Sequence, residues 1–398
     1  MFFFKIISSL LSRFHVEKII KRQYVQDYAT LVELCKQLEK SKLLAIDTEF
    51  VRTRTLYPKL GLLQVSDGEV IALIDPVTIE DLSPFWALLT NEHIVKVLHA
   101  CSEDLEVFLT AANCKPVNFI DSQIMMAFLG HGLSLGYAAM VQHFTGVELD
   151  KSESRTDWIK RPLTERQKTY AEADVEYLHQ IYPKIYQLIV DAGWLAAAQQ
   201  ETQLMIERKF TPIDGEFMYQ NIKMNWKLNA KQLNALKYLA AWRYQQAQKR
   251  DLPLGFIAKD HTLIAIAQRD PISVGAMIGI EGVEVLDIKH KGKAMLQVLN
   301  QANKIPENEY PEKIIRLDDY PAYKQIFKQV KNFIAKAAKD ADLLPENLAS
   351  KKQINHFLSW HFKINNADKD ENIIDILYGW RFELFGEKLQ TFANNDFK

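Results

Sequence analysis

The sequence predicts a domain of mixed strands and helices followed by an all-helical remainder. The chain has 398 residues, which is enough for two or three domains of typical size. Short apolar strand patterns alternate with helical patterns as far as about Phe210. Beyond that residue the strand patterns stop, and apolar residues at helical spacing continue nearly to the end of the chain.

The composition is that of an ordinary soluble protein, with 48% hydrophobic and 25% charged residues. The formal net charge is -1, so no global positive field attracts nucleic acid or membranes. Any anionic partner must therefore be held by local patches or metal ions. The three cysteines, Cys35, Cys101 and Cys114, fit neither a disulfide framework nor a zinc site, which favours a reducing cytoplasm.

Residues 1–20 alternate between apolar and basic side chains. They lack the uninterrupted apolar stretch of a signal peptide and the roughly 20 apolar residues of a spanning helix. We interpret them as an amphipathic or disordered extension, with peripheral membrane attachment as the alternative. We expect no stable membrane partner.

The first elements are a helix and three strands. Leu31, Leu34 and Leu38 lie at helical spacing and predict a helix over residues 28–38. Strands are predicted at 43–50, 60–65 and 70–74. The last two are joined by Asp67-Gly68, a pair typical of tight hairpin turns because such turns need a positive φ. The sequence therefore predicts a three-stranded antiparallel meander.

The strand at 43–50 carries two acids one residue apart. Side chains alternate along a strand, so Asp47 and Glu49 face one way while Thr48 faces the other. Two carboxylates about 4 Å apart repel by roughly 4 kcal/mol at an effective dielectric constant of 20. A cation or a shifted pKa would relieve this repulsion. Our hypothesis is a divalent metal site, and the alternative is a pair of solvated acids at a strand end.

A third acid follows a buried strand at 94–98. Ser102 is a plausible N-cap for the next helix, which places Asp104 in the first turn, where a negative charge suits the helix dipole. Helix stabilisation alone is the alternative for Asp104. The other elements expected in this region are a helix at 82–89, a strand at 118–120 and a helix capped by Asp121.

A charged loop at 149–163 interleaves basic residues with an aromatic ring. Lys151 and Trp158 are its candidates for binding a phosphate and stacking a base. A solvated surface loop is the alternative.

A capping-box pattern, Thr164 to Gln167, opens a long helix to about Ile189. On this helix Tyr170 and Asp174 are four residues apart and so lie on one face. An acid and a phenol are thus presented together, with core packing as the alternative for the tyrosine.

The helical remainder has two parts separated by a linker. A long helix is predicted at 228–248, and the polar segment 303–310 contains Pro306 and is interpreted as the linker. Helices are expected again at 323–337, 352–362 and 373–385.

The acids Asp47, Glu49, Asp104 and Asp174 form a set of carboxylates without Cys or His. Such a set selects hard cations such as magnesium or manganese. Two of these ions about 4 Å apart can stabilise the attacking and leaving oxygens in phosphodiester hydrolysis. Tyr170 could hold the attacking water by a hydrogen bond.

The motifs around these acids resemble those of the ribonuclease D family. Residues 47–55 (DTEFVRTRT), with 57–58 and 60–62, resemble its first exonuclease motif. His99-Ala100 with Asp104 resembles the second. Residues 170–174 (YAEAD) resemble the third motif of the tyrosine branch of DEDD 3'-to-5' exonucleases. The blocks at 133–135 and 151–158 also match in order and spacing, so the resemblance spans roughly Tyr24 to Ile206.

The helical remainder resembles two copies of the helicase-and-ribonuclease-D C-terminal (HRDC) module. The residues that carry this resemblance are Trp242-Arg243 with 251–253 in the first copy, and 350–354 with 379–381 in the second. The resemblance implies a ribonuclease-H-like exonuclease domain, with a mixed sheet flanked by helices, followed by two small helical bundles. The implied boundaries are 1–22 for the extension, 23–210 for the exonuclease domain, and 227–302 and 315–395 for the HRDC-like domains.

The same resemblance implies the roles of the site residues. Asp47, Glu49 and Asp174 would bind the first metal, Asp47 would bridge to a second, and Asp104 would support that second ion mostly through water. Tyr170 would orient the nucleophilic water. The implied cofactors are two Mg²⁺ or Mn²⁺ ions.

The implied activity is trimming of the 3' ends of transfer RNA precursors and other small structured RNAs, with release of nucleoside 5'-monophosphates. RNA is then the expected partner, and no obligate protein partner is evident. A DNA 3'-to-5' exonuclease of the same superfamily is one rival, because the acids would be identical. A non-catalytic RNA-binding protein that keeps the fold is another.

Three further residues are weaker candidates for contact with the substrate. Arg52 and Arg54 follow the acid-bearing strand and could meet phosphates, with surface ion pairs as the alternative. His99 is interpreted as structural or adjacent to the substrate, because magnesium sites disfavour imidazole.

Overall fold

The computed structural model describes residues 20–366 and 374–398, so most of the predicted N-terminal extension lies outside the described residues. The chain divides into two compact units. The first holds the chain as far as Val51, together with Leu60–Gln123 and Gly136–Leu188. The second holds Arg52–Lys59, Ile124–Leu135 and Ile189–Lys398. Each unit is described in turn.

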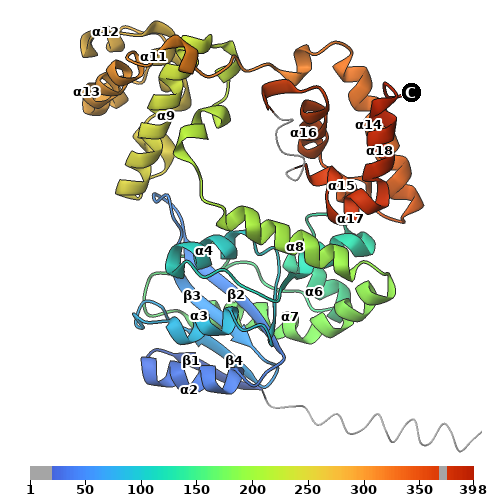
Figure 1. Cartoon of the computed structure of the whole chain (residues 1–398). Helices are drawn as coiled ribbons and strands as arrows, with labels where there is room; N and C mark the ends of the chain where they lie inside the picture. The colour runs from blue at the N-terminus through green and yellow to red at the C-terminus, as the bar shows by residue number, and fades with distance from the viewer. Residues whose placement is uncertain (1–19, 367–373) are drawn as a thin grey trace, which may run out of the picture. The chain divides into compact units, whose positions relative to one another are not determined.

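The first unit is built on a mixed sheet that, in the described part of the chain, has six strands in the order β1-β4-β3-β2-β5-β6 (Figure 1). The β1–β4, β2–β5 and β5–β6 pairs are parallel, and the β3–β4 pair is antiparallel. β2, the acid-bearing strand, therefore lies inside the sheet between β3 and β5. The strands are β1 (Lys21–Val25), β2 (Leu43–Val51), β3 (Lys59–Ser66), β4 (Val70–Ile74), β5 (Val95–Leu98) and β6 (Phe119–Asp121).

The predicted hairpin between β3 and β4 is confirmed. Asp67 Oδ1 accepts hydrogen bonds from the backbone N–H groups of Glu69 and Val70, and Gly68 has a φ of +82°. A glycine adopts this conformation without steric cost, which makes the tight turn possible.

β1 was not predicted from the sequence. It begins at Lys21, inside the segment expected to be an extension, and it pairs in parallel with β4. Its sequence KRQYV has no regular alternation of apolar residues, so the local pattern gave no strand signal. The partner strand, distant in sequence, supplies the structure.

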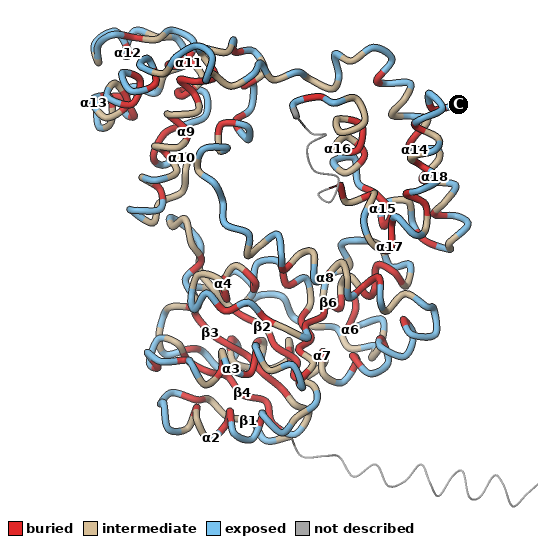
Figure 2. Tube along the Cα trace, viewed as in Figure 1, coloured by how far each residue is buried: buried red, intermediate tan, exposed pale blue. Residues whose placement is uncertain are grey.

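Helices pack beside this sheet, and the residues of its strands are mostly buried (Figure 2). The apolar side chains of these strands form the core. Cys35, Cys101 and Cys114 are free thiols buried in this unit. The prediction that Ser102 caps its helix is wrong, because Ser102 is the first helical residue and the helix has no side-chain cap. The helices are α2 (Tyr28–Leu38), α3 (Ser83–Leu89), α4 (Ser102–Ala112), α5 (Ser122–Met126), α6 (Tyr137–Thr145) and α7 (Glu165–Asp191), of which α5 and α7 continue into the second unit.

The second unit is dominated by helices. Its hydrophobic cluster around α9 includes Leu233, Leu236, Leu263 and Met295. Capping boxes at Asn229 and Ser350 begin α9 and α16. The helices are α8 (Leu195–Phe210), α9 (Ala230–Arg250), α10 (Leu254–Ile257), α11 (Asp260–Arg269), α12 (Val274–Ile278), α13 (Val285–Ala302), α14 (Tyr323–Asp340), α15 (Pro345–Leu348), α16 (Lys351–His361), α17 (Gly379–Arg381) and α18 (Glu387–Asn394).

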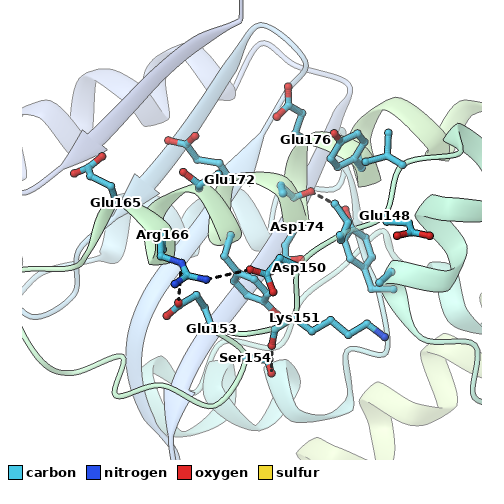
Figure 3. A pocket seen from close by; sticks show the side chains of 18 of the residues that line it. Glu148, Asp150, Lys151, Glu153, Ser154, Glu165, Arg166, Glu172, Asp174 and Glu176 are labelled. Atoms are coloured by element: carbon cyan, nitrogen blue, oxygen red, sulfur yellow. Dashed lines mark hydrogen bonds and ion pairs between the residues drawn. The ribbon is translucent and has the colours of Figure 1, made fainter.

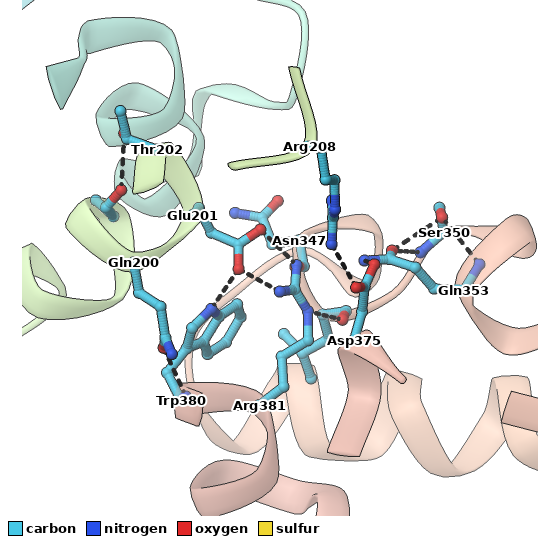
Figure 4. A network of polar contacts seen from close by, with 12 residues as sticks. Gln200, Glu201, Thr202, Arg208, Asn347, Ser350, Gln353, Asp375, Trp380 and Arg381 are labelled. Atoms are coloured by element: carbon cyan, nitrogen blue, oxygen red, sulfur yellow. Dashed lines mark hydrogen bonds and ion pairs between the residues drawn. The ribbon is translucent and has the colours of Figure 1, made fainter. Parts of the chain in front are cut away.

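A polar network within the second unit joins α8 to α17 (Figure 4). The guanidinium of Arg381 donates through Nη1 and Nη2 to the carboxylate of Glu201, and the Nη2 bond to Oε2 is 3.0 Å long. The indole of Trp380 donates to the same carboxylate at 2.7 Å, and its backbone N–H donates to Gln200 Oε1 at 2.9 Å. Arg381 is 5% exposed, so this is a nearly buried ion pair.

Among the described residues, none of the helices combines the length and the apolar character needed to cross a bilayer.

Candidate active site

The acid pair of β2 lies at the centre of the candidate site. β2 is paired with neighbours on both sides, which fixes the alternation of its side chains. One carboxylate oxygen from each of Asp47, Glu49 and Asp174 lies within 4.8 Å of the other two. The two neighbouring acids of β2 and an acid distant in sequence therefore converge on one point.

α7 delivers both Asp174 and Tyr170. Its start is fixed by the predicted capping box, in which Gln167 N–H donates to Thr164 Oγ1 at 3.1 Å and Thr164 N–H donates to Gln167 Oε1 at 3.0 Å. The four-residue spacing then places the phenol and the carboxylate on one face of the helix. Both side chains line the cavity that contains the acid pair.

Asp104 enters the same cavity from the first turn of α4 but lies outside the group of three converging carboxylates. Its Oδ1 accepts a hydrogen bond of 2.5 Å from Thr48 Oγ1. Thr48 is buried and was expected to face away from the acids. In the sequence, the position of Thr48 between Asp47 and Glu49 was the one sign that its hydroxyl could contact a carboxylate.

The cavity around these residues has a volume of about 200 Å³. Its lining also includes Phe50, His99, Ala100, Glu103, Tyr137 and Leu178. A larger hollow of about 850 Å³ shares Tyr137, Tyr170 and Asp174 with it (Figure 3). The two hollows therefore share part of their walls, and the larger one has room for part of a polymeric substrate.

Lys151 from the charged loop also lines the larger hollow. A contact between Lys151 and the substrate stays a prediction. Arg166, on α7, binds that loop through Asp150 at 3.4 Å and Glu153 at 3.8 Å. These ion pairs link the loop to α7, and the exposure of Arg166 limits each to at most about 1 kcal/mol.

The electrostatics of the acid cluster favour a cation. Loss of water and the charges of Asp174, Asp104 and Glu49 raise the pKa of Asp47 well above its ordinary value. Loss of water and the charges of Asp174 and Asp104 raise the pKa of Glu49 to about 9. Loss of water followed by the charge of Asp104 raises the pKa of Asp174 to about 8. A carboxylate set of this kind fits a hard divalent ion, because a positive charge removes the repulsion and returns the groups to their ionised state.

Asp104 differs from the other three acids. Loss of water raises its pKa to about 6, and the hydrogen bond from Thr48 opposes the rise. The hydrogen bond from Thr48 thus offsets part of the cost of burying the charge of Asp104.

His99 and Tyr137 complete the cavity wall. The hydroxyl of Ser122 donates to the carbonyl of Leu98 at 2.9 Å, so it accepts a hydrogen bond from His99 Nδ1, which lies 2.9 Å away. Tyr137 packs edge-on against the imidazole and donates its phenol proton to the carbonyl of Ala173 at 2.9 Å. Tyr137 was missed from the sequence, because an aromatic residue at the start of a helix gives no signal of its own.

The prediction that Trp158 stacks on a base is wrong. Its side chain is 1% exposed and belongs to a core cluster with Leu62, Leu73 and Leu163. Its ring lies 6.1 Å from the ring of Tyr170, centroid to centroid. Trp158 therefore packs against Tyr170 from the core side, and its burial prevents contact with a substrate.

The predicted arginines, Arg52 and Arg54, are exposed on the loop after β2. That loop belongs to the second unit, whereas the acid cluster belongs to the first. A contact between either arginine and the substrate stays a prediction.

Comparisons with known proteins agree with this geometry. Residues 22–189 match the model of a 3'-5' exonuclease family, residues 232–299 an HRDC domain, and residues 321–389 the C-terminal HRDC domain of ribonuclease D. Ribonuclease D of Cronobacter turicensis is 44% identical over 365 residues, which cover 92% of this chain and 98% of that protein. The Escherichia coli ribonuclease D is 43% identical over 363 residues, which cover 91% and 95%.

A solved structure is similar along nearly the whole chain. It is that of Escherichia coli RNase D, described as an exoribonuclease involved in structured RNA processing. It superimposes with a TM-score of 0.89 at 41% identity and covers 94% of this chain and 99% of its own.

The fold and the carboxylate cluster define a 3'-to-5' exonuclease of the DEDD class, which uses divalent metal ions. The similarity along nearly the full length narrows this class further. The chain belongs to the ribonuclease D family, with a mixed-sheet exonuclease domain followed by helical HRDC domains, and it is a ribonuclease D-type exonuclease.

Proposed function

We propose that this protein removes nucleotides from the 3' ends of transfer RNA precursors and other small structured RNAs, and releases nucleoside 5'-monophosphates. The observation that carries the proposal is the convergence of Asp47, Glu49 and Asp174 in one cavity with Asp104 and Tyr170. The similarity to ribonuclease D supports RNA as the substrate.

The four acids have different roles in holding the metal ions. Asp47, Glu49 and Asp174 would hold one Mg²⁺ or Mn²⁺ ion, because their oxygens lie close enough to bind the same cation. Asp47 and Asp104 would hold a second ion. Such ions, when bound, activate a water molecule and offset charge on the leaving oxygen.

Tyr170 orients the attacking water through its phenol. Loss of water and the negative charges of Asp174, Glu49 and Asp47 raise the pKa of Tyr170 above its ordinary value, so the phenol keeps its proton at neutral pH. A protonated phenol can donate to one oxygen and accept from another, which is what positioning a water requires.

The decisive assay uses a transfer RNA with a 3' extension, the full-length protein and Mg²⁺, with and without a chelator. We expect stepwise shortening that the chelator stops, and 5'-monophosphates as products. Asp47→Asn, at the centre of the cluster, is the matched inactive control. Binding of the RNA without shortening would favour the non-catalytic rival.

Substrate choice is tested by single-stranded RNA and DNA of one sequence. Discrimination would rest on contacts to the 2'-hydroxyl, since the metal chemistry is the same for both sugars. We expect faster loss of RNA. Preferential loss of DNA would favour the rival DNA exonuclease.

The proposal also covers organisation and location. We place the exonuclease domain at 23–210 and the HRDC-like domains at 227–302 and 315–395, and we propose that the enzyme acts in the cytoplasm. Its three cysteines are free thiols, the state that a reducing compartment maintains.

A further inference from the structure

α14 of the second helical domain carries a row of lysines on its outer face. At about 100° per residue, Lys324, Lys328, Lys331 and Lys339 lie within an arc of about 80°. Lys336 lies beside them, and all five are exposed. We call these five residues the lysine face. The opposite side of α14 is fixed in the domain by buried residues that include Val330 and Ile334.

None of the five lysines forms an ion pair with a described residue. The first helix of the other HRDC domain, α9, behaves differently. There Lys231 pairs with Asp270 at 3.0 Å, and Lys237 pairs with Glu216 at 3.0 Å. The lysines of the first helix are thus largely neutralised by acids in the first HRDC domain, whereas those of α14 in the second domain keep their positive charge.

The positive charge is also concentrated along the sequence. Residues 313–339 contain seven Lys and Arg against two Asp, a net charge of +5, whereas the whole chain has -1. Five lysines spread along about 22 Å of helix can meet several phosphates of one strand. A local patch of this kind can attract RNA even to a chain without positive net charge.

We propose that the lysine face binds the phosphate backbone of the RNA substrate, in addition to the metal site. The proposal takes RNA as the substrate from the proposed function. An anionic membrane, the other large polyanion, is the less suitable partner. Membrane-binding helices insert an apolar face into the lipid, and the apolar face of α14 is buried in its own domain.

The test compares RNA binding by two triple variants of the full-length protein, both made in the Asp47→Asn background so that the RNA survives. The first replaces Lys324, Lys328 and Lys331 by Gln, which keeps the helix propensity nearly unchanged. The control replaces Lys351, Lys352 and Lys388, which are exposed lysines of the same domain outside the lysine face. Both variants lose the same charge.

Affinity for single-stranded RNA is measured over a range of salt concentrations. Each lost phosphate contact lowers the slope of log K against log salt by about 0.7. We expect the slope of the lysine-face variant to be less steep by about 2. The variant should also bind RNA about 10- to 100-fold more weakly near 0.1 M salt. The control should keep the slope of its parent. Equal slopes for both variants would overturn the proposal, and so would a loss confined to vesicles with anionic lipid.

A second readout separates this proposal from the proposed function. With Asp47 intact, the lysine-face variant should hydrolyse a dinucleotide as fast as the unaltered enzyme but show a raised KM for a long RNA. A native enzyme inactive on every RNA would refute the proposed function itself. Normal hydrolysis of long RNA by the lysine-face variant, with unchanged KM, would refute only the lysine face.

Discussion

The three converging carboxylates oppose folding when no cation is bound. Folding raises the pKa of Asp174 to about 8, so below about pH 4 the group is protonated in both the folded and the unfolded state. As the pH rises from about 4 to about 8, the unfolded chain ionises first and gains stability relative to the folded one. The cost is therefore greatest at neutral and alkaline pH.

Asp174→Asn should remove this cost. We expect the Tm of the metal-free protein to rise at pH 7.5, by the equivalent of a few kcal/mol at most, and to change little at pH 4. Thermal unfolding in the presence of a chelator measures both values. Hydrolysis by the same variant should be lost. A lower Tm at pH 7.5 would show that Asp174 is structural.

Tyr170→Phe should slow hydrolysis without removing metal binding. In its proposed role the phenol holds the attacking water and not the ion, so the loss should be in kcat, by about 10- to 1000-fold. The rise in Tm on addition of Mg²⁺ should persist, because the three carboxylates are intact. An unchanged kcat would exclude the water-orienting role.

At this scale the sequence predicts residues whose placement depends on a local period. Alternation along a strand predicted that Asp47 and Glu49 lie on one face of β2. The helical repeat predicted that Tyr170 and Asp174 lie on one face of α7. Trp158 was misjudged because nothing in a charged loop shows that one side chain turns into the core. Thr48 was missed because its partner, Asp104, comes from another element.

At the scale of elements, the loop before α7 is held by a buried ion pair. Arg161 donates to Asp75 through Nη2 at 2.6 Å and through Nε at 2.7 Å, and Asp75 is fully buried. Tyr24 of β1 donates to the same carboxylate. Although burial opposes it, these hydrogen bonds hold the pKa of Asp75 below its ordinary value, so the pair stabilises the fold above about pH 4 and loses this effect as the pH falls further.

Arg161→Met should therefore destabilise the protein by about 3–5 kcal/mol, since it leaves a buried carboxylate without its partner. Denaturant unfolding at pH 7 measures the loss. The double variant with Asp75→Asn should recover part of it, because no charge is then buried. A loss below about 1 kcal/mol would mean that the ion pair behaves like an exposed one.

Elements with their own start and turn signals were predicted well from the sequence. The Asp67-Gly68 hairpin and the Thr164–Gln167 capping box are examples, because each is specified within four residues. β1 was not predicted, since its strand conformation depends on pairing with β4 about 50 residues later. β4 carries an apolar strand pattern of its own, whereas β1 carries none, so the pairing could not be predicted from β1 alone.

At the scale of the whole molecule, the change of pattern near Phe210 correctly predicted the helical remainder. It could not predict the contact between Glu201 and Arg381, which are 180 residues apart. Gly379, beside this contact, has a φ of +55°, and a Cβ there would lie 1.8 Å from Gln200 Nε2. A side chain at residue 379 would therefore require Gln200, which accepts a hydrogen bond from the Trp380 backbone N–H, to move.

Arg381→Met should weaken this junction by a few kcal/mol, because the carboxylate of Glu201 would lose the guanidinium that neutralises it and keep only neutral donors such as the Trp380 indole. Limited proteolysis should then cut the second helical domain sooner than in the unaltered protein. Arg208→Gln is the matched control: Arg208 pairs with Asp375, but its side chain is 54% exposed, so its loss should cost less than about 1 kcal/mol. Equal proteolysis of the two variants would contradict a role for the buried pair.

The burial of all three cysteines makes the protein suitable for spectroscopic labelling. Burial raises the pKa of Cys35 to about 12 and also raises the pKa values of Cys101 and Cys114, so these thiols stay protonated and react slowly with maleimides. A cysteine introduced at the exposed Lys328 would carry a fluorophore almost alone. Its emission could then report, molecule by molecule, when an RNA arrives at α14 and when it leaves.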